Sequence, residues 1–184
     1  MDGNEKEISL VPYVELNGTR TASDNKMAEL FKSVVDQKLL RWVFCEGHVR
    51  GPDEFLRVMK DPGNLVVLVV VGETISGFAW LNELRTNRAT AHFCFLKDVW
   101  GKTAVKAGKQ IIDYWFTFTK ESGSQMFDVI TGLTPANNHK AISFIKRMGF
   151  TILGEIPYTC HDQFALKKVP GVVSYKTRSI EDGR

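Results

Sequence analysis

The sequence has no apolar run long enough to cross a bilayer. Its longest such run, residues 65–71, is far shorter than the roughly 20 residues that a transmembrane helix needs. The opening segment MDGNEK also lacks the apolar core of a secretory signal peptide. We therefore expect a soluble, cytoplasmic protein that has no membrane partner.

Cysteine is scarce and irregularly placed. The three cysteines are Cys45, Cys94 and Cys160, and no two of them have C-x-x-C spacing. An odd number at such wide spacing argues against a disulfide framework or a zinc knuckle. We expect reduced thiols and no metal site.

No charge of either sign dominates. The chain has 24 Lys and Arg against 21 Asp and Glu, so its formal net charge is only +3. This excess is too small to predict a nucleic-acid or membrane surface by itself, although it permits a local site for an anion. One cluster of basic residues suits a phosphate, a nucleic acid or simply solvent: Lys97, Lys102, Lys106 and Lys109.

Internal repeats and low-complexity segments are also absent. With 184 residues and 43% hydrophobic content, the chain suits one compact domain, which we place at residues 1–168. Residues 169–184 contain Pro170 and Gly171 and end in polar residues, so we expect a C-terminal tail there.

Hydrophobic periodicity predicts helices and strands in alternation, and hence an α/β (α+β) fold. The predicted strands are residues 8–16, 64–71, 74–82, 89–96, 126–132, 150–156 and 163–167. The first predicted helix starts at residue 23 or 24, and three more cover residues 52–59, 102–120 and 135–149. An aromatic loop at residues 41–51 separates the first two helices.

The corner between strand 89–96 and helix 102–120 has the chemistry of a phosphate site. A helix N-terminus presents unpaired backbone amides and a positive dipole to an anion. Gly101 stands at this corner, between Trp100 and Lys102, and glycine permits a close approach of the backbone. The corner therefore suits a pyrophosphate.

A second motif lies in the next helix. Asn138 and Ala141 are followed by Gly149 and Phe150, which fits a capped helix that stops at a glycine before a strand. In this order, the strand meander, the corner and this motif resemble the GCN5-related N-acetyltransferase superfamily over residues 64–168. The Trp-Gly-Lys corner looks more like the branch that acetylates ribosomal-protein N-termini than like the antibiotic-resistance branch. The resemblance implies a single domain with a mixed, largely antiparallel sheet and helices on both faces.

The resemblance also implies acetyl-CoA or another acyl-CoA as a substrate. The residues that would bind it are Phe95, Lys97, Gly101, Lys102, Thr103, Ala104, Val105 and Asn138. The family loop runs Arg or Gln, two residues, Gly, one residue, then Gly or Ala. Here Trp100, Thr103 and Val105 stand at those positions, so the phosphate loop is degenerate and the backbone amides of residues 101–105 would carry the binding.

Acyl transfer to an amine needs a proton for the departing thiolate. The family often supplies this proton from a tyrosine late in the helix that contains Asn138, where this chain has Ile145. Tyr158, Cys160 and His161 are the candidates to replace it, and each suits a surface or packing role equally well.

The transfer also needs a base for the amine. His92 shares a predicted strand face with Cys94, so it could face the acceptor with a pKa near neutrality, or fill space as a hydrogen-bonded core residue. Glu83 and Glu46 are further candidates, or solvated acids.

The aromatic loop suits either an acceptor pocket, with Glu46 and His48 as polar contacts, or packing onto the sheet. The leading hypothesis is an acyl-CoA-dependent N-acyltransferase for an unidentified amine acceptor. The alternative is a catalytically inactive binding or assembly module of the same fold, for instance phage or prophage associated. Thr103, Val105 and Ile145 favour the alternative.

Overall fold

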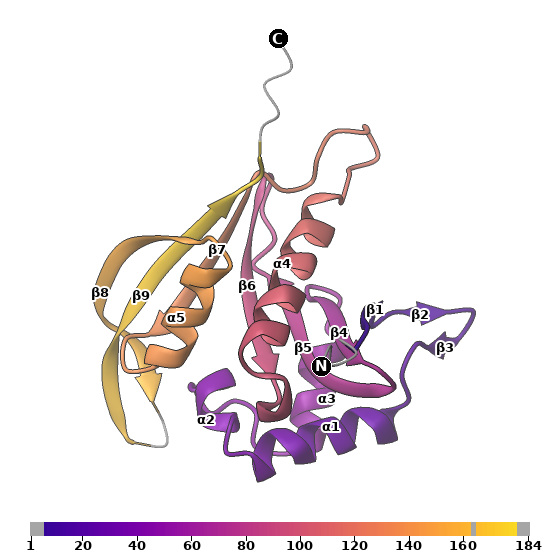
Figure 1. Ribbon diagram of the computed structural model, residues 1–184, viewed down its shortest axis with the longest axis horizontal. Helices are drawn as coiled ribbons and strands as arrows, with labels where there is room; N and C mark the ends of the chain where they lie inside the picture. Colours follow the sequence, from indigo (N-terminus) through magenta and orange to yellow (C-terminus); the bar gives the residue numbers. More distant parts are fainter. Residues whose placement is uncertain (1–5, 163–164, 180–184) are drawn as a thin grey trace, which may run out of the picture.

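The computed structural model describes residues 6–162 and 165–179 (Figure 1). Its centre is a seven-stranded sheet in the order β1-β4-β5-β6-β7-β9-β8. Every neighbouring pair is antiparallel except β6 and β7. The strands of this sheet are β1 (Ile8–Pro12), β4 (Leu65–Val71), β5 (Thr74–Asn82), β6 (Arg88–Phe95), β7 (Val129–Pro135), β8 (Thr151–Asp162) and β9 (Lys167–Thr177). A separate small hairpin joins β2 (Glu15–Leu16) and β3 (Thr19–Arg20).

Helices cover both faces of the sheet, as predicted. They are α1 (Asp24–Asp36), α2 (Leu40–Val43), α3 (Pro52–Lys60), the 3₁₀ turn η1 (Lys97–Val99), α4 (Lys102–Phe116) and α5 (His139–Arg147). Phe31 of α1 and Phe55 of α3 share one buried cluster with Trp80 of β5. Ile111 of α4 and Ile145 of α5 share the other. The predicted α+β class with a mixed, largely antiparallel sheet is confirmed. In the part of the chain described, no helix has the length and apolarity that a membrane span requires.

Side chains of β6 alternate between the two clusters. Cys94 packs with the α1 and α3 side, whereas Ala91 and Phe95 pack with the α4 and α5 side. This is the alternation that the sequence predicts, because successive residues of a strand point to opposite faces. Residues on one strand can therefore serve two different halves of a site.

Local signals fix the helix ends. The Ser23 hydroxyl accepts a hydrogen bond from the Lys26 amide at 3.3 Å and caps α1. Asn138 Oδ1 accepts from the Ala141 amide at 3.2 Å and caps α5. Gly149 follows α5 with φ of +85°, a conformation that favours glycine. Helix α5 begins at His139 rather than residue 135, because Pro135 still belongs to β7.

The predicted C-terminal tail is wrong in its first part. Residues Lys167–Thr177 form β9, which lies between β7 and β8 in the sheet. Pro170 and Gly171 do not end the chain's folded part, because the ladder shifts register between Ile156 and Cys160 opposite them. The predicted strand at residues 163–167 is also wrong, because its last residue, Lys167, is the first residue of β9. Residues 163 and 164 lie outside the described part. Residues 180–184 of the predicted tail lie outside it too.

Smaller differences concern element ends. The predicted aromatic loop contains the short helix α2, β7 begins at Val129 rather than residue 126, and α4 ends at Phe116 rather than residue 120. The predicted first strand is divided between β1 and β2.

Candidate active site

The sheet is open at its centre. Strands β6 and β7 pair at three positions only, from Arg88↔Val129 to Thr90↔Thr131. Beyond Thr90 and Thr131 they spread apart toward α2, as Figure 1 shows. The diverging segments, residues 91–95 and 132–135, border a cavity of about 1100 Å³, which we call the central cavity. Its lining includes residues from both buried clusters, so it reaches both faces of the sheet.

On the α4 and α5 side, the central cavity meets the N-terminus of α4. Gly101 precedes this helix with φ of +96°, and no side chain caps the helix there. The first helical bond joins the Val105 amide to the Gly101 carbonyl at 3.3 Å, so the amides of residues 102–104 have no acceptor within the helix. A Cβ atom on Gly101 would meet nothing within 4 Å, so backbone angle rather than space favours glycine. This end of α4 is electrostatically suited to an anion.

Trp100 occupies the position where the family pattern has Arg or Gln. Its indole nitrogen donates to the Phe95 carbonyl at 2.8 Å, which fixes the ring against the end of β6. The Lys140 ammonium lies 4.7 Å from the ring centroid and the Lys97 ammonium 6.0 Å. All three of these side chains line the central cavity, so its rim carries two cations from different elements.

Most of the predicted cofactor-binding residues lie together. The six that line the central cavity are Phe95, Lys97, Gly101, Ala104, Val105 and Asn138. Lys102 is exposed and Thr103 half-buried, and neither is part of the lining. The structure therefore assembles the predicted corner, with those two side chains beside the cavity rather than in it.

On the opposite face, the cavity wall is a stack of rings. Phe44 stacks on Trp80 at 5.6 Å between centroids, and His92 lies flat on Trp80 at 4.4 Å and 10°. His92 Nε2 is 3.0 Å from Asn82 Oδ1, an oxygen that can only accept, so Nε2 carries the hydrogen. Burial lowers the pKa of His92 to about 4, which corrects the expectation of a value near neutrality. His92 is uncharged at neutral pH.

Three oxygen-bearing side chains meet where β6 and β7 separate, a point we call the vertex. Thr90 and Thr131 are the last ladder partners, and their hydroxyl oxygens are 3.2 Å apart. Thr90 donates to Glu83 Oε2 at 2.8 Å, so the single hydrogen of the Thr131 hydroxyl is shared between two acceptors, the Thr90 hydroxyl and the Ala89 carbonyl at 3.1 Å. Glu83 and Thr90 line the central cavity.

Helix α2 and the loop after it border the central cavity on the face of the sheet that carries His92. Phe44 is buried and both packs onto the sheet and lines the central cavity, and Trp42, Glu46 and His48 line the cavity with it. The Arg41 guanidinium, on α2, bonds the buried Asp162 carboxylate at the end of β8 at 2.7 Å. This ion pair connects α2 to the β8–β9 hairpin.

The sequence matches no protein-family model and no curated protein, so structure alone supplies the comparison. The spermidine N-acetyltransferase of Vibrio cholerae, solved with CoA and spermine, has a TM-score of 0.72 and 14% identity over 94% of this chain and 96% of that one. A Salmonella typhimurium acetyltransferase that modifies the N-terminal serine of ribosomal protein L7/L12 has a TM-score of 0.72 and 9% identity, over 93% of this chain and 95% of that one. The microcin C7 self-immunity acetyltransferase, solved with acetyl-CoA and AMP, has a TM-score of 0.70 and 14% identity, over 95% of this chain and 94% of that one.

The chain has the GCN5-related N-acetyltransferase fold. Agreement extends over nearly the whole length of each structure. The polyamine and ribosomal-protein enzymes match equally well by TM-score, so the fold does not favour the predicted ribosomal branch.

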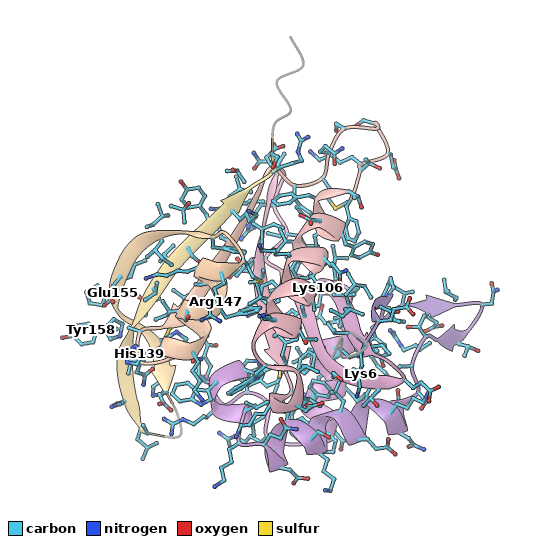
Figure 2. All side chains as sticks on the ribbon, in the orientation of Figure 1. Lys6, Lys106, His139, Arg147, Glu155 and Tyr158 are labelled. Atoms are coloured by element: carbon cyan, nitrogen blue, oxygen red, sulfur yellow. The ribbon has the colours of Figure 1, made fainter. Side chains whose placement is uncertain are left out.

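The residues that the sequence suggests as proton donors to the thiolate do not gather at the central cavity of this N-acetyltransferase fold. Tyr158 is 75% exposed on β8, and Figure 2 shows it pointing outward. It has φ of +58° and follows Pro157, within the register shift that turns this part of β8 away from the ladder. His161 is exposed and outside the lining. Cys160 does line the cavity, but burial raises the pKa of its thiol.

The sequence did not point to several residues at this site. Asn82, Thr90 and Lys140 line the central cavity, and Thr131 lies beside it in contact with Thr90. Thr90 shares the strand face of His92, and this alternation was a usable signal. Thr131 was beyond local reasoning, because its place depends on the parallel register of two strands that are distant in sequence.

Proposed function

We propose that the protein transfers an acyl group from an acyl-CoA to an amine. The observation that carries this proposal is the opening between β6 and β7, a cavity that joins an anion-favouring helix end on one face to a carboxylate-bearing pocket on the other. A two-substrate transfer needs such a passage, because the acyl donor and the acceptor must meet at one point. The polyamine, ribosomal-protein and microcin enzymes with this fold support the same assignment.

The residues on the cofactor side fit a phosphorylated donor despite the degenerate loop. Backbone amides of residues 102–104 donate without regard to side-chain identity, and within the described part of the chain no side chain caps them. Lys97 and Lys140 would add charge at the rim. The main chain of residues 91–95 and 132–135, which do not pair with one another, would border the pantetheine arm.

The other half of the cavity suits a cationic amine. Glu46 and Glu83 place two carboxylates in its lining, and Trp42 and the uncharged His92 ring supply flat apolar wall. Opposite charge favours an ammonium group there, whereas an acidic acceptor would be repelled. We therefore propose a primary amine that is protonated in solution as the acceptor.

The missing tyrosine does not prevent the reaction. Ile145 of α5 is only 7% exposed and belongs to the buried cluster that α4 shares, so this position supplies no acid. In the balanced reaction, R–NH3⁺ and acyl-S-CoA give R–NH-acyl, CoA-SH and one H⁺. The attacking nitrogen itself loses the proton that the departing thiolate needs, and water can carry it between them.

Calorimetry with acetyl-CoA tests this proposal. We expect a saturable binding heat for the wild-type protein and at least a tenfold weaker affinity for Thr103→Glu, since a carboxylate in the first turn of α4 would repel the pyrophosphate. Gln110→Glu adds the same charge to an exposed position further along α4 and should bind normally. No heat at millimolar acetyl-CoA would refute the cofactor assignment.

Turnover separates an enzyme from a binding module. Released CoA thiol should be measured with spermidine, a peptide with N-terminal serine, and 2-phenylethylamine as acceptors. Release above the rate without amine supports the transferase. Acetyl-CoA binding with no release for any amine would instead support the inactive module.

A further inference from the structure

We infer that Glu83, held by Thr90 at the vertex, is the group that binds the acceptor ammonium and takes its proton. This inference rests on the proposed transferase function and names the ammonium subsite within it. Glu83 would be a catalytic residue because it contacts the acceptor. Thr90 and Thr131 would be positioning residues that act through Glu83.

The first step of the argument is convergence. Glu83 follows the end of β5, Thr90 lies on β6 and Thr131 lies on β7, yet their side chains form one hydrogen-bonded group. Thr90 and Thr131 are direct ladder partners in the last paired position before the strands separate. The group therefore stands at the one place where both diverging strands can contribute to a bound donor and acceptor.

The second step is backbone geometry. Glu83 has φ of +48°, a left-handed conformation that is uncommon and costly for a residue with a side chain. This conformation ends β5 and accompanies a side chain that lines the central cavity. The Thr90 hydroxyl holds the Glu83 side chain through Oε2. Within residues 6–162 and 165–179, Oε1 makes no hydrogen bond or ion pair, which leaves it to accept from a ligand.

The third step is the chemistry of the neighbours. Thr90 and His92 share the strand face that borders the acceptor half of the cavity. His92 donates through Nε2 to Asn82, so Nδ1 is the ring's remaining acceptor. An ammonium group donates three hydrogen bonds, and the vertex offers a charged acceptor beside neutral ones. The ionisable residues of the adjoining elements are His48 on the loop after α2, Arg85 between β5 and β6, Arg88 at the start of β6, and Tyr175 opposite Thr131 on β9.

The proposed step balances as follows. R–NH3⁺ gives one proton to the Glu83 carboxylate, which becomes a neutral acid and later releases that proton to solvent. The resulting neutral amine attacks the thioester carbon and forms the C–N bond. As the C–S bond breaks, the nitrogen loses a second proton, which water delivers to the CoA thiolate.

Binding of 2-phenylethylamine, followed by carboxyl ¹³C NMR of glutamate-labelled protein, tests the ammonium subsite whether or not the natural acceptor is known. We expect this probe to shift the Glu83 resonance and Glu83→Gln to weaken its binding by about tenfold or more, as for the loss of a hydrogen bond to a charged group. The neutral analogue 2-phenylethanol should bind wild type and E83Q alike. Glu73→Gln, at the opposite end of β5, is the matched control and should change nothing. An unshifted Glu83 signal, or a loss of amine binding in Glu46→Gln instead, would overturn the inference.

The amine-induced shift of the Glu83 resonance tests the positioning role of the hydroxyl. Thr90→Val removes the donor that holds Oε2, so 2-phenylethylamine should shift the Glu83 carboxyl resonance less than in wild type and should bind more weakly. Thr90→Ser keeps the hydroxyl and should restore the wild-type response, and Thr74→Val at the start of β5 should leave it unchanged. Equal responses for T90V and wild type would refute the role of Thr90. Because acetyl-CoA calorimetry is independent of these readouts, failure of the cofactor assignment and failure of this subsite are distinguishable.

Discussion

The His92 imidazole lies between a Trp80 ring that excludes water and an Asn82 oxygen that accepts its hydrogen. The Asn82 oxygen can accept from the neutral or the charged ring, so it is burial that favours the neutral form and outweighs the nearby Glu83 charge that favours the cation. A residue type that titrates near pH 6.5 in water is thereby converted into an uncharged wall of the acceptor pocket. Strand alternation predicted which face His92 occupies, but its protonation depends on neighbours from β5 that alternation does not reveal.

The depressed pKa of His92 has a consequence for stability. Above about pH 6.5 the ring is neutral in both the folded and unfolded protein, so it has no effect. As pH falls toward 4, the unfolded chain takes up a proton that the folded protein refuses, and stability is lost by up to about 3 kcal/mol. The free energy of unfolding, measured with urea at pH 7 and pH 4.5, should therefore fall less between these two pH values for His92→Gln than for wild type.

A suitable control for this measurement is His161→Gln, because His161 is exposed on β8. We expect H161Q to retain the wild-type loss of stability between the two pH values. If H92Q and wild type lose the same free energy of unfolding, other groups are responsible for the pH dependence.

At the scale of elements, locally encoded features were predictable and long-range pairing was not. The cap at Ser23, the turn between β4 and β5, and the corner before α4 all rest on residues close in sequence. Strand β9 carries Pro170 and Gly171, which are breakers in most local contexts. Its place in the sheet is determined by partners on both sides, β7 and β8, which local patterns cannot supply. The same limit hid Thr131 from the candidate site.

The structural role of β9 can be tested at one buried position. Val172 is 3% exposed and pairs with both Thr134 and Glu155. Val172→Asp places a charge in this apolar site and should lower the free energy of unfolding by more than about 3 kcal/mol, or abolish folding. Lys168→Asp introduces the same carboxylate at an exposed position of the same strand and should cost less than about 1 kcal/mol. Similar unfolding curves for the two variants would contradict the place of Val172 at a buried position of β9.

Over the whole molecule, the sheet consists of two halves joined by few backbone bonds. Strands β1, β4, β5 and β6 form one half and β7, β9 and β8 the other, and they meet in three ladder pairs. Helix packing adds a second connection, since a Cβ on Gly108 of α4 would fall 2.2 Å from Met148 Sδ beyond α5. The Arg41–Asp162 ion pair adds a third. A ligand between β6 and β7 would contact both halves and so stabilise their relative arrangement.

Hydrogen exchange with two ligands tests this arrangement directly. Acetyl-CoA should slow exchange at the start of α4 and also in residues 91–95 and 132–135, because its pantetheine arm would lie between the diverging strands. Adenosine 3′,5′-bisphosphate carries the nucleotide part of CoA without that arm, so it should slow exchange at the helix start but leave the two strand segments close to their rates in the free protein. If both ligands give the same protection pattern, the arm does not enter the central cavity. The opening in the sheet would then belong to the architecture of the fold and not to acyl transfer.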